Sequence, residues 1–146
     1  MEEATPMNLL RNDDVVALNA LIVAAETLQA RLTMAAERES HVDRHPQPDL
    51  ARRLVDELEP VVARLMQHVR DSGDIPAAPS DELHLVDAGA FRLRLSLGGA
   101  EVLDDVLGEW LSEYETAIET HATQATQAGL EVAALRGVAA ELRGAA

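Results

Sequence analysis

Apolar residues recur at three- and four-residue steps in four segments of the chain, which is the spacing of helices that bury one face. The first segment runs from about residue 12 to residue 40, and Asn12 is suited to cap its N-terminus. Pro46 and Pro48 favour extended geometry just before them, so the helix is expected to end there. Its apolar stripe consists of Leu18, Leu21, Ile22, Ala25, Leu28, Leu32 and Ala36.

The second segment starts at Pro48 or Asp49 and ends near Gly73, a residue that can adopt the left-handed conformation beyond a helix C-terminus. Pro60 interrupts it, but the apolar stripe keeps its phase on both sides. We therefore expect one kinked helix, with two separate helices as the alternative. The stripe consists of Leu50, Leu54, Leu58, Val61, Leu65 and Val69.

Residues 74–99 have a different pattern, punctuated by proline and glycine. Within them, four apolar residues alternate with polar ones at the period of a strand. A lone strand cannot form a sheet, so we expect an irregular or partly helical crossover with its apolar side against the bundle. The alternating apolar residues are Phe91, Leu93, Leu95 and Leu97.

The third helix is expected from about Gly99 to His121, with an acidic outer face, and the fourth from residue 122 or 123 to Arg143. A turn is expected within residues 121–129. The third stripe consists of Leu103, Leu107, Trp110, Tyr114 and Ala117, and the fourth of Leu130, Ala134 or Leu135, Val138 and Leu142.

These segments predict an all-α fold, a four-helix bundle formed by residues 12–146 as a single domain after a flexible N-terminal segment, residues 1–11. The short linker makes the first two helices antiparallel. The crossover of about 25 residues, about 74–99, is long enough to return along the bundle and let the third helix run parallel to the second. One long crossover between the second and third helices is the ferritin-like arrangement, and a plain up-down-up-down bundle is its rival.

Charge and composition exclude several classes of function. The chain has 26 acidic residues against 12 basic ones, all of them arginine, for a net charge of −14. It has no run of basic residues, so we expect no nucleic-acid partner and no binding to anionic membranes. The absence of cysteine excludes thiolate metal sites and disulfides. The acidic N-terminus is unlike a signal peptide, and no apolar run of about 20 residues stands out, so a cytoplasmic protein is expected.

Three stretches resemble the bacterial ferritin-like family of unknown function typified by the PA2169-type proteins, the DUF2383 group. They are residues 14–22, followed by Ala35-Ala36-Glu37; residues 65–76, Leu-Met-Gln-His-Val-Arg-Asp-Ser-Gly-Asp-Ile-Pro; and residues 114–118, Tyr-Glu-Thr-Ala-Ile. The resemblance covers most of residues 12–121. It implies a ferritin-type four-helix bundle and no known reaction. Where such relatives carry Asp-Gly-Glu on the first helix, this chain has Thr27-Leu28-Gln29.

A ferritin-type di-iron site takes carboxylates from two helices and Glu-x-x-His motifs from two more. None of the five histidines has a glutamate three residues before it, and the nearest variant is Asp81-x-x-His84 in the crossover. An intact di-iron site is therefore not expected, and no catalytic or cofactor-binding residue is assigned.

Four polar residues fall on or beside the apolar stripes and form an expected inward polar network: Gln29, His68, Tyr114 and His121. In a parallel arrangement of the second and third helices, His68 and His121 lie near one end of the bundle. They are candidate metal ligands with Glu26 or Glu119 nearby. The preferred interpretation is hydrogen-bonded polar groups that need partners whether or not they do chemistry.

Two hypotheses follow. The first is a non-catalytic helical bundle, without a cofactor, that works by association with itself, as a homo-oligomer and most simply a dimer, or with a protein partner. Val23, Met34 and Val132, which lie off the main stripes, are candidate pairing residues. The alternative is an atypical ferritin-like protein that binds iron or another divalent metal, or acts as an oxidase.

Overall fold

The computed structural model describes residues 4–39, 48–77, 81–98 and 101–145, and the described chain is helical with no strand. The expectation of an all-α protein is confirmed. The helices are α1 (Ala4–Glu39), α2 (Pro48–Asp71), α3 (Asp81–Gly98), α4 (Glu101–His121), the short 3-10 helix η1 (Thr126–Ala128) and α5 (Gly129–Ala145).

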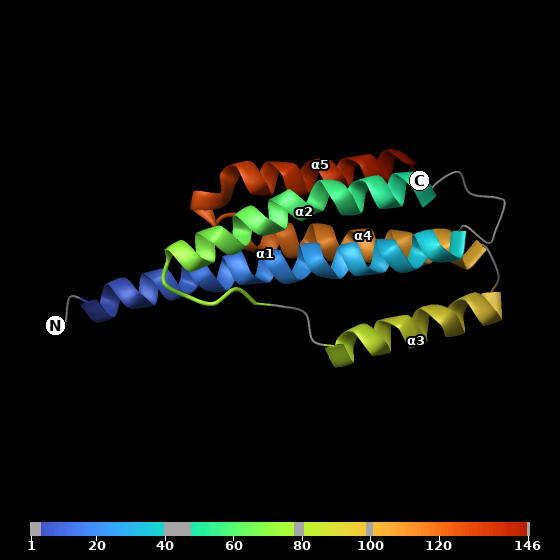
Figure 1. Ribbon diagram of the computed structural model, residues 1–146, viewed down its shortest axis with the longest axis horizontal. Helices are drawn as coiled ribbons and strands as arrows, with labels where there is room; N and C mark the ends of the chain where they lie inside the picture. Colours follow the sequence, from blue (N-terminus) through green and yellow to red (C-terminus); the bar gives the residue numbers. More distant parts are fainter. Residues whose placement is uncertain (1–3, 40–47, 78–80, 99–100, 146) are drawn as a thin grey trace.

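Four of these helices pack together as a bundle. α1 packs against α2 and α4, and α5 packs against the same two helices, so α1 and α5 lie at opposite corners. α1 and α5 run from left to right in Figure 1, whereas α2 and α4 run from right to left. α3 precedes α4 in the chain and lies outside the bundle, against α4 and α1 (Figure 1).

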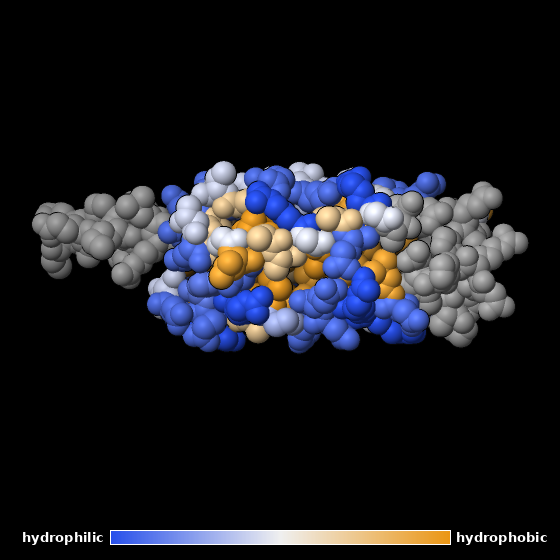
Figure 2. Space-filling model, turned by 90° about the horizontal axis from the view of Figure 1, so that it is seen from above, coloured by the Kyte–Doolittle hydropathy of each residue, from blue (hydrophilic) through white to orange (hydrophobic). Residues whose placement is uncertain are grey.

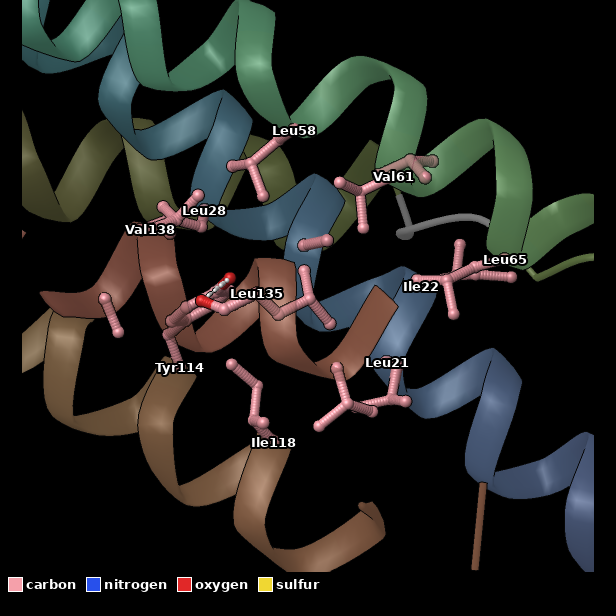
Figure 3. Packing of buried hydrophobic residues seen from close by; sticks show 14 of the residues in the cluster. Leu21, Ile22, Leu28, Leu58, Val61, Leu65, Tyr114, Ile118, Leu135 and Val138 are labelled. Carbon is pink, nitrogen blue, oxygen red and sulfur yellow. Dashed lines mark hydrogen bonds between the residues drawn. The ribbon is translucent and has the colours of Figure 1, made fainter. Parts of the chain in front are cut away.

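The core is filled by aliphatic side chains from all four bundle helices. Figure 3 shows them pointing toward one another in the middle of the bundle, and all are at most 4% exposed. Because Leu, Ile and Val dominate, interdigitation rather than polar contact determines the packing there. The labelled residues are Leu21, Ile22 and Leu28 of α1, Leu58, Val61 and Leu65 of α2, Tyr114 and Ile118 of α4, and Leu135 and Val138 of α5.

α1 is longer than expected. It begins at Ala4 rather than Asn12, so residues 4–11 of the segment expected to be flexible belong to the helix. Its stretch Asp13–Glu37 is long and apolar enough to cross a membrane by length and composition alone. The expectation that no such stretch exists was wrong, because charged residues are sparse in this helix. The same stretch supplies Leu18, Leu21 and other core residues.

α2 is a single helix that continues through Pro60, so the expectation of one helix is confirmed and the two-helix alternative is wrong. Pro60 lies on the exposed side of the helix. Gly73 has a φ of +82°, and the amides of Gly73 and Asp74 bond to the carbonyls of Arg70 at 2.9 Å and Val69 at 3.1 Å. These two bonds form a Schellman cap, which only a residue tolerant of positive φ completes without strain.

The crossover is partly helical, as one of the two expected alternatives states, because α3 occupies Asp81–Gly98 and residues 74–77 are not helical. The apolar residues that alternate along the sequence do not form a strand. They lie on two sides of the helix α3. Phe91 is buried at 3% exposure and lies 5.2 Å from the ring of Trp110, as expected for the side facing the bundle. Leu93 and Leu97 are 60% and 80% exposed, so the expectation that they pack against the bundle was wrong.

The turn expected within residues 121–129 lies at residues 122–125, followed by η1, and α5 starts only at Gly129. The fourth helix therefore begins later than residue 122 or 123. Leu130 is 84% exposed and does not belong to the buried stripe. Val132 takes that place at 4% exposure, which removes it as a candidate for surface pairing, and Met34 packs against a small cluster around Trp110.

The face formed by α2 and α5 is seen from above in Figure 2. Apolar residues gather along the middle of this face, and hydrophilic residues flank them on both sides. Exposed Leu130 and the exposed small residues Ala133, Gly137 and Ala140 belong to α5. Small surface residues of this kind are ordinary for a helical bundle and need no partner to explain them.

Candidate functional site

A polar cluster lies at the end of the bundle where α2 finishes and α5 begins. Glu131, in the first turn of α5, is the buried charged residue of the described chain, at 5% exposure. His68 Nε2 lies 3.2 Å from Glu131 Oε1, and Arg64 Nε lies 3.6 Å from the same oxygen. The positive end of the α5 dipole also stabilises the carboxylate.

This arrangement satisfies Glu131 better than it would hold a metal ion. The Arg64 guanidinium shares an oxygen with His68, and a positive charge there opposes the approach of a cation. One imidazole and one carboxylate are also fewer ligands than a structural or catalytic metal site normally takes. His68 therefore contacts a buried carboxylate, a partner that the sequence analysis did not name.

His121 is the last residue of α4 and is partly exposed. Its carbonyl oxygen accepts hydrogen bonds from the amides of Gln124 at 3.2 Å and Ala125 at 3.1 Å, which closes the turn after α4. α2 and α4 end on the same side of Figure 1, so His68 and His121 lie at the same end of the bundle. Within the described ranges, no hydrogen bond or ion pair joins them.

Gln29 lies on the seam between α1 and α2 rather than in the core. Its Nε2 donates to the carbonyl oxygen of Val55 at 3.1 Å and to Glu59 Oε2 at 3.3 Å. Glu26 is partly buried one turn earlier, and one of its carboxylate oxygens, Oε1, is buried without a hydrogen-bond partner. Burial, and then the charge of Glu59, raise the pKa of Glu26 above its usual value.

Tyr114 is buried in the middle of the bundle, and its hydroxyl donates a hydrogen bond of 2.9 Å to the carbonyl oxygen of Leu135 (Figure 3). Burial raises the pKa of Tyr114, so the hydroxyl stays neutral and keeps its role as a donor. This bond joins α4 to α5. It is the part of the expected inward polar network that lies deepest in the core.

Glu119 lies on the outer surface and forms a two-pronged pair with Arg136 of α5, with both N–O distances at 2.8 Å. The hydrogen bond from Arg136 lowers the pKa of Glu119. Glu119 is thus separated from the interior and occupied by a cation of the protein itself. It does not join His68 or His121 in a metal site.

The candidate metal ligands are therefore dispersed. In the part of the chain that the structure describes, no group of three or more His, Asp or Glu side chains is placed to hold a metal ion. His68 has Glu131, Glu119 has Arg136, and Glu26 lies on the α1–α2 seam near Glu59. The middle of the bundle, where a ferritin-type site would lie, holds aliphatic side chains and the Tyr114 hydroxyl (Figure 3).

A second polar cluster, which the sequence analysis missed, joins three helices around Arg31 of α1. Its guanidinium bonds to Asp87 of α3, with Nε to Oδ2 at 2.8 Å, and to Glu113 of α4. It also lies 5.5 Å from the Trp110 ring centre, within the range of a cation–π contact. Burial lowers the pKa of Arg31, but the hydrogen bonds and charges of the two carboxylates outweigh it and raise the pKa overall.

A cavity of about 210 Å³ lies beside Arg31, between α1 and α4. Pockets for small organic ligands usually have volumes of about 300–1,000 Å³ and several converging polar groups. This one is smaller, and its charged groups already pair with each other. The cavity is lined by Ala24, Thr27, Leu28, Arg31, Trp110, Glu113, Tyr114 and Ala117.

Sequence alone did not indicate this cluster, because Arg31 and Asp87 are far apart in the chain. The only available signal was Arg31 on a largely apolar helix, where a lone cation needs a partner. No protein-family model, no curated protein and no solved structure matches the chain.

Proposed function

We propose that this protein is a non-catalytic helical bundle of ferritin-like topology that works by association, with a second copy of itself or with a protein partner. The topology is supported by the parallel course of α2 and α4, with α3 between them in the chain (Figure 1). The resemblance of residues 12–121 to a ferritin-like bacterial family of unknown function points the same way. The proposed compartment is the cytoplasm, with no nucleic-acid or membrane partner.

The observation that carries the proposal is that the polar groups in the middle of the bundle and at its α2–α5 end already have partners within the chain. The Tyr114 hydroxyl bonds to Leu135, the Glu131 carboxylate bonds to His68, and aliphatic side chains fill the space between them. Such an interior stabilises a bundle, and the cavity of about 210 Å³ beside Arg31 is smaller than the usual pocket for an organic ligand. The function is then carried by the surface of the protein, where α3 exposes large apolar side chains.

The alternative, an atypical metal-binding or oxidase protein, would have to use the His68 and Glu131 end of the bundle. Elemental analysis of protein expressed with added iron separates the two. The proposal predicts less than stoichiometric iron. It also predicts a solution mass above that of one chain, because the chain associates with a second copy or with a protein partner. About two irons per chain, lost in both His68→Ala and His121→Ala, would contradict it.

A further inference from the structure

One side of α3 is apolar and faces away from the bundle. Leu85, Val86, Leu93 and Leu97 are 74%, 66%, 60% and 80% exposed. Contiguous exposed apolar surface of this kind marks an interaction site more often than scattered leucines do. A helix that is apolar on more than one side is normally covered on more than one side. α3 is covered by the bundle on its Phe91 side.

The exposed side has the spacing of a helix-pairing seam. Val86, Ala90, Leu93 and Leu97 follow one another at steps of four, three and four residues, and each is exposed. Steps of this kind keep side chains in line along one side of a helix and form the contact line of paired helices. The seam spans about 16 Å at a rise of about 1.5 Å per residue.

We propose that this side of α3 is covered by α3 of a second copy of the chain, with the two helices antiparallel around a two-fold axis. The inference rests on the proposed function, since it names the surface of self-association. The spacing of the seam residues, in steps of four, three and four, is the same from both ends. An antiparallel pair therefore sets Val86 against Leu97 of the second copy and Ala90 against Leu93 of the second copy. Each contact joins a larger side chain to a smaller one, and the two-fold axis makes each contact twice.

Charge on the flank of the seam fits the same arrangement. Asp87 and Arg94 lie two turns apart on one flank of α3, so an antiparallel copy brings Asp87 next to Arg94 of the second copy, and the reverse. Within the chain, Asp87 already bonds to Arg31, and Arg94 lies 2.7 Å from Glu109. The pairing would extend the two ion pairs within each chain into networks of alternating charge across the two-fold axis. A parallel pair would set this flank of the two copies on opposite sides of the contact and would form no such network.

Net charge opposes the association and provides a test. Two chains that each carry −14 repel each other, and added salt screens this repulsion. Raising the salt concentration from about 0.1 M to about 1 M shortens the Debye length from about 10 Å to about 3 Å. The dimer should therefore become stronger at high salt. Association driven mainly by attraction of opposite charges would become weaker.

Sedimentation velocity of the full chain compares Leu93→Glu on α3 with Leu130→Glu on α5 as the matched control, since both leucines are exposed on helices. The control should associate like the natural protein. Leu93→Glu should lower the association constant roughly a hundredfold, because each of the two copies loses a buried leucine. Circular dichroism should show the same helix content in both variants. The opposite result, with only the control impaired, would overturn the α3 proposal and place the contact on α5.

Cross-linking tests the antiparallel orientation, because the natural chain has no cysteine. Val86→Cys and Leu97→Cys chains, prepared separately and then mixed under oxidising conditions, should form a disulfide-linked heterodimer. Each variant alone should not, because the two copies of one position lie about 16 Å apart in the antiparallel pair. Cross-linking of each variant alone would overturn the proposal in favour of a parallel pair.

These outcomes distinguish this inference from the proposed function. A dimer that persists unchanged in Leu93→Glu would overturn the α3 surface and leave self-association standing. A natural protein that is monomeric at every concentration and salt would overturn the α3 surface as well. The proposed function as a whole fails on a different result, stoichiometric iron bound to the chain.

Discussion

The hydroxyl group of Tyr114 donates a hydrogen bond to the main-chain carbonyl oxygen of Leu135, across the buried contact between α4 and α5. A buried hydroxyl needs such a partner, because leaving it unbonded in an apolar core costs about 1–3 kcal/mol. The bond explains how a polar residue lies among aliphatic side chains. It also assigns a structural role to the residue that lies deepest in the expected polar network.

Tyr114→Phe should therefore lower the free energy of unfolding by about 0.5–1.5 kcal/mol without loss of helix. The pKa of Tyr114 is raised in the folded state, so the folded protein holds this proton more tightly than the unfolded chain does. Stability should then fall as pH rises above the ordinary tyrosine value of about 10. Urea denaturation at several pH values measures both effects. A variant whose stability has the same slope above pH 10 as the natural protein would refute this role.

Glu131→Gln should destabilise the bundle by about 1–2 kcal/mol, because the charge-assisted contact with His68 and the favourable position at the α5 N-terminus are both weakened. Glu141→Gln is the matched control. Glu141 lies on the same helix and pairs with Arg53 of α2, but it is exposed, so its ion pair is worth less. An equal loss in the free energy of unfolding in the two variants would show that the burial of Glu131 does not strengthen its contacts.

Glu26→Gln should stabilise the protein slightly at neutral pH. The pKa of Glu26 is raised, so the folded state disfavours its charged form, and this carboxyl group weakens folding as pH rises above about 4.5. Glu26→Gln should lack the fall in stability that the ionisation of Glu26 causes as pH rises. Glu59→Gln should reduce it as well, because Glu59 is the second cause of the shift. Denaturant midpoints between pH 4 and pH 7 measure the effect, and a less stable Glu26→Gln at pH 7 would count against it.

Arg31→Ala should loosen α3 while the four bundle helices keep their packing. The substitution leaves Asp87 and Glu113 without their shared partner and removes the contact with Trp110, for a loss on the order of 1 kcal/mol. Hydrogen exchange should then speed up in α3 before it does in α2. Arg136→Ala, which affects the α4–α5 surface instead, should leave α3 unchanged. Equal acceleration of hydrogen exchange in all helices would contradict a specific role of Arg31 in holding α3 against the bundle.

Periodic apolar residues made the bundle helices predictable. Leu18, Leu21 and Leu28 on α1, and Leu54 and Leu65 on α2, are buried as their three- and four-residue steps indicate. Each of these helices has one apolar side, and one side facing a core is what such steps encode.

Two features were not predictable from local pattern. α3 was expected as an irregular or partly helical crossover because apolar residues occur on two of its sides, which produces the alternation at Phe91, Leu93 and Leu97. Leu130 was assigned to the core because it continues a stripe, but α5 begins at Gly129 and its orientation places Val132 inside instead.

The contacts that the polar residues make also could not be predicted from the sequence. His68 was recognised as an inward polar residue, but its contact with Glu131 depends on how α2 meets α5. Arg31 and Asp87 come together because α3 lies against α1. Contacts between distant segments follow from the packing of whole helices, and no spacing along the chain encodes them.

The most direct test of association as the function is the molar mass of the natural protein by sedimentation velocity over a wide range of concentration, at low and high salt. We predict a mass that rises from that of the 15.7 kDa chain toward twice that value, and that rises further at high salt. A single species of 15.7 kDa at every concentration and salt would contradict self-association.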